Sequence, residues 1–136
     1  MRTALILAVI LFWIPLYEAF GAETGIDSNR AVNAIIGEAE GEGYRGMLAI
    51  ACAIRNRGNL KGVYGEKASR VLGKKYSQKT LELAQKAWAE SATKDITNGA
   101  DHWGGKAVDK AWIAKMKKNG FIKTFEYGNQ EFYKRK

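Results

Sequence analysis

The sequence predicts a mainly helical α+β fold with a small β-hairpin at its C-terminal end. Apolar residues recur at three- and four-residue spacing in several stretches up to residue 118, which is the period of an amphipathic helix. Residues 121–133 instead place aromatic and β-branched residues on both sides of a glycine–asparagine pair, which is typical of two paired strands. A chain of 136 residues can build one substantial core but not two.

The first predicted helix carries an apolar stripe over residues 31–39. Asp27 or Ser28 can cap its start, because a short side-chain oxygen accepts hydrogen bonds from the free amides of the first turn. Three glycines after residue 40 favour an end to the helix in that region. Glu38 lies at the edge of the apolar stripe, which is an unusual position for a free carboxylate.

A second apolar helix follows and ends at Arg57, with Gly58 well suited to the position just beyond the last turn. Arg55 and Arg57 in its last turn complement the negative end of the helix dipole. The single cysteine, Cys52, falls inside this apolar helix. We expect it to be a buried small hydrophobe rather than a reactive thiol.

The remaining elements are predicted from the same kinds of signal. Ser77 is a helix cap, and the stripe that follows it includes Trp88, which we expect in the core. The predicted elements are a short helix at 66–72, a helix at 77–93, an irregular or extended segment at 95–105, a helix at 107–118 and strands at 121–125 and 130–133.

A glutamate at the edge of an apolar face is a candidate general acid. Burial disfavours the charged form of a carboxyl group, and a second carboxylate nearby, such as Glu42 four residues after Glu38, disfavours it further. A glutamate that keeps its proton near neutral pH can protonate a glycosidic oxygen. The residues alone favour the plainer interpretation, in which Glu38 borders the core and reaches water while Glu42 caps a turn.

Three sequence blocks change that balance. The run EAEGE at 38–42, followed by Gly46 and the Asn-Arg pair at 56–57, resembles the signature of the SleB-type cell wall hydrolases, the spore cortex-lytic enzyme family. The segment 98–103 is similar to the family's Gly-Ala-aromatic block, and 127–133 is similar to its closing Gly-Asn-His-x-Phe strand, with Gln130 in the place of the histidine. Residues 59–76 lack the family's Gln-x-Phe segment, which leaves the sugar and peptide specificity open.

The resemblance implies a compact lysozyme-like domain that acts on peptidoglycan glycan strands as a lytic transglycosylase. In that reaction the N-acetylmuramic acid to N-acetylglucosamine β-1,4 bond is cleaved and a 1,6-anhydro product forms. One glutamate, here Glu38, serves as both acid and base, and no metal or cofactor is needed. Glu42 is expected to orient the substrate or Glu38. The other candidate cleft residues are Tyr44, Asn56, His102, Trp103, Tyr127 and Asn129.

Two other functions stay open. The first is hydrolysis of the same bond in the manner of a muramidase, with Glu42 or Asp101 positioning a water molecule. The second is a non-catalytic peptidoglycan-binding module that holds glycan through its basic and aromatic surface. Trp103 fits a position in the core as well as one in the cleft, because the large apolar ring of a tryptophan packs well in either place.

The charge balance points to anionic partners. The formal net charge is +8, from 22 lysines and arginines against 14 acidic residues. Such a protein is attracted to polyanions, among which we expect anionic polymers of the cell envelope. We do not expect nucleic acid as a partner, since the sequence contains no known nucleic-acid-binding motif.

His102 is the only histidine and no histidine–cysteine cluster exists, so a metal site is not expected. We expect a monomer.

Residues 1–22 have the pattern of a secretory signal peptide. Arg2 provides the positive start, residues 4–17 form an apolar run shorter than the roughly 20 residues of a membrane span, and 19–21 read small-x-small. A retained signal anchor at the inner membrane is the alternative. In either case residues 23–136 form the catalytic domain, exported to the periplasm, the cell wall or the medium.

Overall fold

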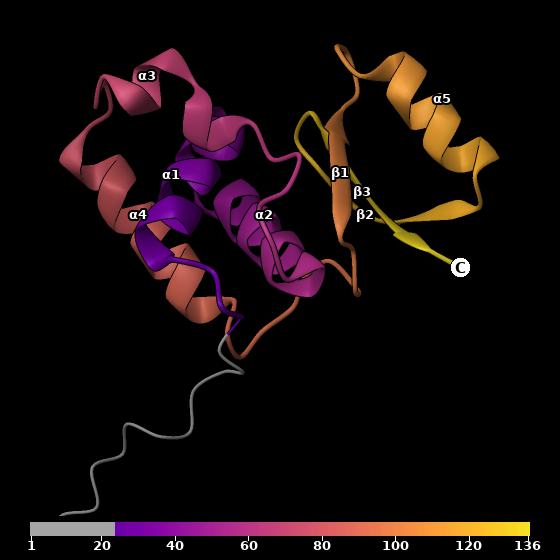
Figure 1. Cartoon of the computed structure of the whole chain (residues 1–136), viewed down its shortest axis with the longest axis horizontal. Helices are drawn as coiled ribbons and strands as arrows, with labels where there is room; N and C mark the ends of the chain where they lie inside the picture. The colour runs from indigo at the N-terminus through magenta and orange to yellow at the C-terminus, as the bar shows by residue number, and fades with distance from the viewer. Residues whose placement is uncertain (1–23) are drawn as a thin grey trace, which may run out of the picture.

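The computed structural model describes residues 24–136, and the signal predicted at residues 1–22 lies outside the described residues. In Figure 1 four helices form one side of the molecule, and a small sheet with a fifth helix forms the other. Among residues 24–136, no helix combines the length and the apolar character needed to cross a membrane.

The two central helices form where the sequence predicts them. Helix α1 spans Ser28–Ala39, and the side chain of Asp27 caps it by accepting a hydrogen bond from the Arg30 amide at 2.9 Å. A single 3₁₀ turn, η1 (Glu40–Glu42), leads into α2 (Gly43–Arg57). Gly58 follows α2 with a left-handed φ of 77°, as expected of a glycine cap. All residues of α2 from 46 to 54 are buried, Cys52 among them, so α2 is the central element of the core.

The helix predicted at 66–72 is split in two. Residues Gly65–Lys67 form a 3₁₀ turn, η2, and Ser69–Leu72 form the short helix α3, because Ala68 between them has an extended ψ of 137°. Helix α4 (Gln78–Glu90) is capped by Ser77, as predicted, and ends three residues before the predicted boundary at residue 93. Trp88 of α4 is only 7% exposed, which confirms it as a core residue.

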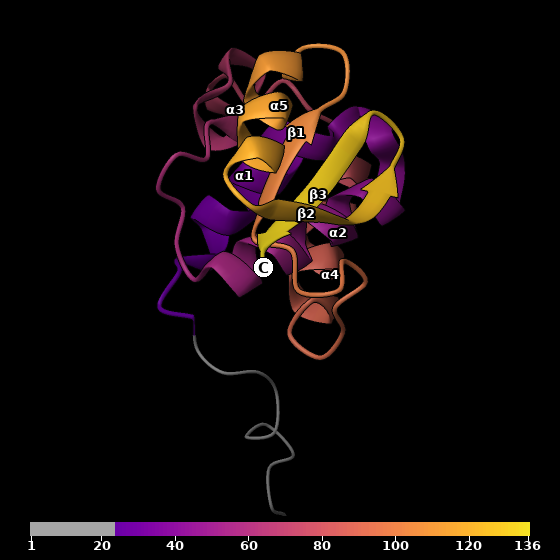
Figure 2. The ribbon, with the colours of Figure 1, turned by 90° about the vertical axis from the view of Figure 1, so that its right-hand side faces the viewer.

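The predicted hairpin is present, but it is part of a three-stranded sheet. Strands β2 (Phe121–Tyr127) and β3 (Gln130–Arg135) pair antiparallel, and β1 (His102–Gly105) pairs with the other edge of β3. The order is therefore β1-β3-β2, and Figure 2 shows β3 between its two neighbours. The segment 95–105, predicted to be irregular or extended, is irregular up to residue 101 and then forms β1. The predicted hairpin gives only part of the sheet, because the sequence did not indicate that β1 pairs with it.

The sheet separates two apolar clusters. Phe132 of β3 belongs to the main core with α1, α2 and α4, whereas the next residue, Tyr133, faces Ile113 and Met116. Successive side chains of a strand point to opposite faces of the sheet, so both faces of β3 are covered. Ile113 and Met116 lie on α5 (Lys110–Lys118), which packs on the side of the sheet away from α2 (Figure 1). Helix α5 begins three residues later than the prediction at residue 107.

Candidate active site

Glu38 lies near the C-terminal end of α1 and is half-buried. Its two carboxylate oxygens accept hydrogen bonds from two different elements. The Gly65 amide donates to Oε1 at 2.9 Å, and the indole Nε1 of Trp103 donates to Oε2 at 3.2 Å. Both donors are uncharged N–H groups, so they fix the direction of the carboxylate without supplying a counter-charge.

Two glycines allow the turn η2 to approach α1 this closely. A Cβ atom on Gly37 would collide with the backbone of Gly65, and one on Gly65 would lie 2.7 Å from Cγ of Glu38. Real Cβ atoms essentially never make contacts that short. The Gly65 amide can therefore reach Glu38 because neither position carries a side chain.

Glu38 faces a cleft of about 750 Å³ that lies between the helical side of the molecule and α5. This volume is in the range of small-ligand sites. Strand β1 and the start of β3 contribute Trp103 and Gln130 to its lining. The loop after α2 contributes Tyr64, and α5 contributes Trp112. Gly104 makes room for the Trp112 ring, since a Cβ atom there would lie 2.7 Å from it.

Gln130 also supports the backbone of the catalytic candidate. Its Nε2 donates to the main-chain oxygen of Glu38 at 3.4 Å, and its Oε1 is buried without a hydrogen-bond partner among the described residues. The hydrogen bond ties the start of β3 to the end of α1. Glu38 is thus held through its side chain by η2 and β1, and through its main chain by β3.

The fold that carries this cleft occurs in solved structures. The catalytic domain of the germination-specific lytic transglycosylase SleB from Bacillus anthracis aligns with a TM-score of 0.59 and 24% identity, over 83% of this chain and 96% of that one. The chain has the SleB catalytic-domain fold. The catalytic domain of the Bacillus cereus SleB protein aligns with a TM-score of 0.52 and 20% identity, over 84% of this chain and 92% of that one.

The likeness to SleB confirms the resemblance noted in the sequence and the predicted lysozyme-like α+β fold. At these identities it establishes the fold alone. No family model matches the sequence, and no curated protein matches it.

Within this SleB fold, His102 and Asn129 line the cleft together with Glu38 and Trp103. His102 Nδ1 is 2.7 Å from Asp101 Oδ1, and the imidazole packs edge-on against Phe121 with a centroid separation of 4.8 Å. The side chain is therefore oriented by its neighbours.

Glu42 approaches the hairpin turn rather than Glu38. Its Oε1 accepts a hydrogen bond from the Asn129 amide at 3.1 Å, and the carboxylate lies where a Cβ atom on Gly128 would be. Gly128 has a φ of 54°, so the turn needs glycine both for its conformation and for this approach. Glu42 therefore fastens the β2–β3 turn to η1.

Tyr44 and Tyr127 do not come together with the other candidates. Tyr44 packs on the main core and donates its hydroxyl hydrogen bond to Glu90 on α4, and burial together with this bond raises the pKa of Tyr44 to about 12. Tyr127 lies beneath the Arg45 guanidinium, 5.8 Å from the ring centroid. Neither side chain lines the cleft that holds Glu38.

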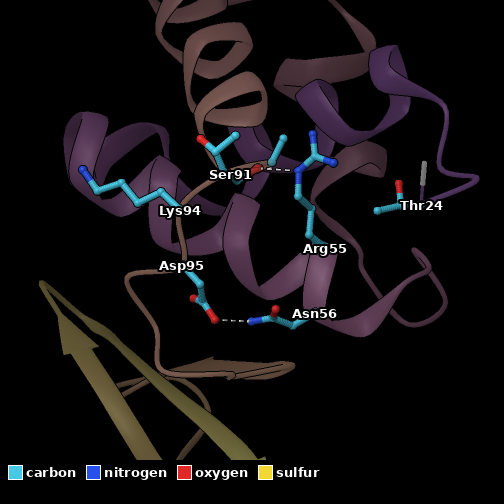
Figure 3. Close-up of a pocket in the computed structure, with 8 residues that line it drawn as sticks. Thr24, Arg55, Asn56, Ser91, Lys94 and Asp95 are labelled. Atoms are coloured by element: carbon cyan, nitrogen blue, oxygen red, sulfur yellow. Dashed lines mark hydrogen bonds between the residues drawn. The ribbon is translucent and has the colours of Figure 1, made fainter. Parts of the chain in front are cut away.

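Asn56 also lies elsewhere, beside the loop that connects α4 to β1. Its Nδ2 donates to Asp95 Oδ2 at 3.0 Å and to the Ala100 carbonyl at 2.9 Å, and Figure 3 shows the first of these bonds. Asp95 in turn accepts from the amides of Thr97 and Gly99. Asn56 therefore anchors the segment that leads into β1, and it acts on the cleft only through the position of that strand.

Several residues that line the cleft are not among those predicted from the sequence. Arg57, Tyr64, Asp109, Trp112 and Lys115 all lie there. Tyr64 and Trp112 come from elements that are separate in the sequence, and no spacing rule joins them. Tyr64 is 72% exposed, so this aromatic side chain of the cleft lining is open to solvent.

Cys52 has no role in this site. It is buried in α2 and donates to the Lys94 carbonyl at 3.1 Å, and burial raises the pKa of its thiol to about 11. Among residues 24–136, no group of three or more histidine, cysteine, aspartate and glutamate side chains is arranged to hold a metal ion.

Proposed function

We propose that this protein is a peptidoglycan lytic transglycosylase that cleaves the N-acetylmuramic acid to N-acetylglucosamine β-1,4 bond with Glu38 as its single acid and base. The observation that carries the proposal is the setting of Glu38. Its carboxyl group faces a cleft of about 750 Å³ and is oriented by the Gly65 amide and the Trp103 indole.

The reaction needs one proton carrier. Glu38, protonated at the start, gives its proton to the glycosidic oxygen while the bond from that oxygen to the muramyl C1 breaks. The C6 hydroxyl of the same muramyl residue then attacks C1 and returns a proton to Glu38. The products are a free 4-hydroxyl on the leaving sugar and a 1,6-anhydromuramyl end. The N–H groups of Gly65 and Trp103 stabilise Glu38 in its charged form between the two steps.

The lining of the cleft suits a sugar chain. Tyr64, Trp103 and Trp112 approach it from three different elements. The face of an aromatic ring packs well against the C–H face of a sugar ring, while the hydroxyl and N-acetyl groups at the edge stay available for hydrogen bonds. The SleB domains that share this fold are described as catalytic, and one of them as a lytic transglycosylase.

Hydrolysis of the same bond is the second candidate function, and the position of the Asp109 carboxylate favours it. Asp109 is a second carboxylate in the lining of the same cleft, and its Oδ2 accepts from the Gly105 amide at 2.6 Å. Its other oxygen could position a water molecule for attack on C1. The earlier candidates for this role are engaged elsewhere, Glu42 with Asn129 and Asp101 with His102.

We infer that the protein is exported, with residues 1–22 as its signal and 23–136 as its catalytic domain, since its proposed substrate lies outside the cytoplasm. The net charge of +8 favours association with anionic envelope polymers as well as with glycan strands. We propose that it acts as a monomer.

The test is digestion of purified peptidoglycan by residues 23–136, beside Glu38→Gln, with the products identified by mass spectrometry. Anhydromuropeptides from the parent and none from the variant are expected. Glu82→Gln, on the exposed face of α4, is the matched control and should keep parental activity.

The other outcomes separate the alternatives. Muropeptides with reducing ends, which are one water heavier than the anhydro products, would show that the protein is a hydrolase and not a transglycosylase. Asp109→Asn would then be expected to abolish these products. If the parent and Glu38→Gln both bind glycan and neither releases products, the protein is a non-catalytic peptidoglycan-binding module.

A further inference from the structure

Arg57 is one of two cations, with Lys115, in the lining of the cleft that holds Glu38. It lies in the last turn of α2, and it lines the same cleft as Glu38. Its guanidinium carbon lies over the Trp103 ring, 5.9 Å from the centroid. Since the same indole donates to Glu38, a single aromatic side chain links the guanidinium to the catalytic candidate.

The chain around Arg57 leaves its guanidinium accessible from the cleft. Gly62, with a φ of 75°, passes beside it, and a Cβ atom there would lie 3.3 Å from Nη2. A larger residue at this position would press on the guanidinium as well as strain the backbone. The loop after α2 therefore passes close to Arg57, which is half-buried and still contributes to the lining of the cleft.

Arg57 also differs from the other arginines near the core. Arg30 pairs with Glu66, Arg70 pairs with Glu40, and Arg55 donates to Ser91 and to the Trp88 carbonyl. Within residues 24–136, no carboxylate or carbonyl group accepts a hydrogen bond from Arg57 in this structure. A half-buried guanidinium with its donors free is suited to an acceptor brought by a ligand.

Among the described residues, the lining of the cleft holds two carboxylates and two cations, so an anionic group of a ligand would be attracted to the cationic positions. The two carboxylates, Glu38 and Asp109, already accept hydrogen bonds from uncharged N–H groups. The two cations are Arg57 and, on α5, Lys115. The planar guanidinium can form two parallel hydrogen bonds to a carboxylate, which a lysine cannot do.

We propose that Arg57 binds a carboxylate carried by the muramyl residue whose bond is cleaved. This inference rests on the proposed function, since it names the part of that substrate that one residue of the same cleft recognises. The muramyl sugar differs from N-acetylglucosamine by its 3-O-lactyl group. That group ends in a carboxylate when no peptide is attached, and otherwise it leads to the carboxylates of the stem peptide. Arg57 thus makes the enzyme specific for a muramyl residue beside Glu38.

The experiment compares kcat/KM on matched soluble glycan strands. One pair consists of strands that carry stem peptides, with their carboxylates free or converted to methylamides. The other pair consists of strands freed of peptide by an amidase, with their lactyl carboxylates free or converted in the same way. The proteins compared are the parent, Arg57→Gln, Arg57→Lys and Arg45→Gln.

The parent is expected to prefer the free carboxylates by about tenfold or more, and Arg57→Gln to reduce this preference to less than about twofold, mainly through KM. Arg57→Lys keeps the charge without the planar fork and should fall between the two. Arg45 also lies over aromatic rings, those of Phe125 and Tyr127, but outside the cleft, so Arg45→Gln should keep the parental preference.

The two substrate pairs identify the source of the carboxylate. A preference lost by Arg57→Gln on peptide-free strands assigns the lactyl carboxylate, and one lost only on peptide-bearing strands assigns a stem carboxylate. The proposal is overturned if the parent shows no preference, if Arg57→Gln keeps it, or if Arg57→Gln lowers kcat/KM equally on free and amidated strands.

A binding measurement separates this proposal from the proposed function. Calorimetry on Glu38→Gln and on Glu38→Gln/Arg57→Gln measures affinity for the same strands without turnover. Carboxylate-dependent binding that disappears with Arg57→Gln supports the assignment of Arg57 even if the parent cleaves no strand, in which case the proposed function alone fails. Equal binding of free and amidated strands by Glu38→Gln overturns the assignment.

Discussion

The indole of Trp103 donates a hydrogen bond to the carboxylate of Glu38 across 65 positions of sequence. This bond joins the sheet to the helical side of the molecule at the proposed catalytic group. It also leaves Trp103 as the shared neighbour of Glu38 and Arg57, since the guanidinium lies over the same ring. The position of β1 is therefore coupled directly to the direction of the Glu38 carboxylate.

Trp103→Phe should keep the aromatic surface and remove the N–H donor. We expect kcat to fall about tenfold or more, because a hydrogen bond to a charged group contributes roughly 1.5–3 kcal/mol. Turnover of soluble glycan strands measures the loss. Trp88→Phe is the matched control, since its indole donates to Ser28 in the helical core, and it should lower the melting temperature without changing kcat. Parental kcat in Trp103→Phe would contradict the role given to the indole.

Glu42→Gln should behave differently from Glu38→Gln. The amide oxygen of glutamine can still accept from Asn129, so we expect a loss of about 1 kcal/mol in the free energy of unfolding and most of the activity retained. Urea denaturation and the peptidoglycan digest measure the two effects. A Glu42→Gln protein as inactive as Glu38→Gln would instead make Glu42 a second catalytic carboxylate.

Gly37→Ala should disrupt the contact between α1 and η2. The added methyl group would meet the Gly65 backbone, and overpacking of this kind costs about 1–3 kcal/mol. We expect lower stability and lower activity together, because Gly65 also holds Glu38. Gly41→Ala is the control, since nothing lies within 4 Å of its added Cβ, and its denaturation midpoint should match the parent. Equal midpoints for the two variants would show that the backbones can separate without cost.

The Asp95 carboxylate should make stability depend on pH in the acid range. Burial alone would raise the pKa of Asp95, but hydrogen bonds from Thr97, Asn56 and Gly99 outweigh it and hold the pKa below the ordinary 3.8. Because the folded-state pKa is lowered, this stabilisation is complete above pH 3.8 and is lost as the pH falls through the folded value.

The expected size of that effect is modest, since Asp95 is exposed to solvent. Asp95→Asn should reduce the free energy of unfolding by about 1 kcal/mol near pH 7, and the difference from the parent should shrink at the lowest pH that keeps both proteins folded. Urea denaturation at several pH values measures it. A difference that stays constant with pH would mean that the carboxylate charge contributes nothing.

Cys52 should not react with a thiol reagent in the folded protein at pH 8. Its pKa of about 11 keeps the thiol protonated, and its side chain is buried in α2. Ellman's reagent should detect one thiol per chain only after denaturation. Rapid reaction of the native protein would indicate that α2 opens locally.

The sequence predicts the helical side of the molecule well because the signals there are local. The Asp27 and Ser77 caps, the Gly58 turn and the buried Trp88 follow from spacing and side-chain chemistry over a few residues. Strand β1 gives no such signal. It is four residues long, two of them glycine, and its pairing depends on β3, which lies about 30 positions later in the chain.

The candidate site also combines residues with a local sequence signal and residues whose positions depend on contacts far along the chain. The position of Glu38 at the edge of an apolar stripe makes it a candidate, and the resemblance to the SleB-type signature selects it. Its partners Gly65 and Trp103 depend on tertiary packing. Tyr44 and Asn56 are close to the signature in sequence, but their helical positions direct them toward α4 and toward the Asp95 loop. Nearness in sequence to a catalytic motif is therefore a poor guide to a place in the cleft.

The order of the strands has a consequence for synthesis. Strand β3 is the last of the three to leave the ribosome and the middle one in the sheet, so neither β1 nor β2 has its partner until β3 is made. The helices can collapse earlier, with Glu38 already in place on α1. Gln130, which secures the main chain of Glu38, arrives 92 positions later. Both strand pairings and the hydrogen bond from Gln130 to Glu38 therefore form only after the last strand has been made.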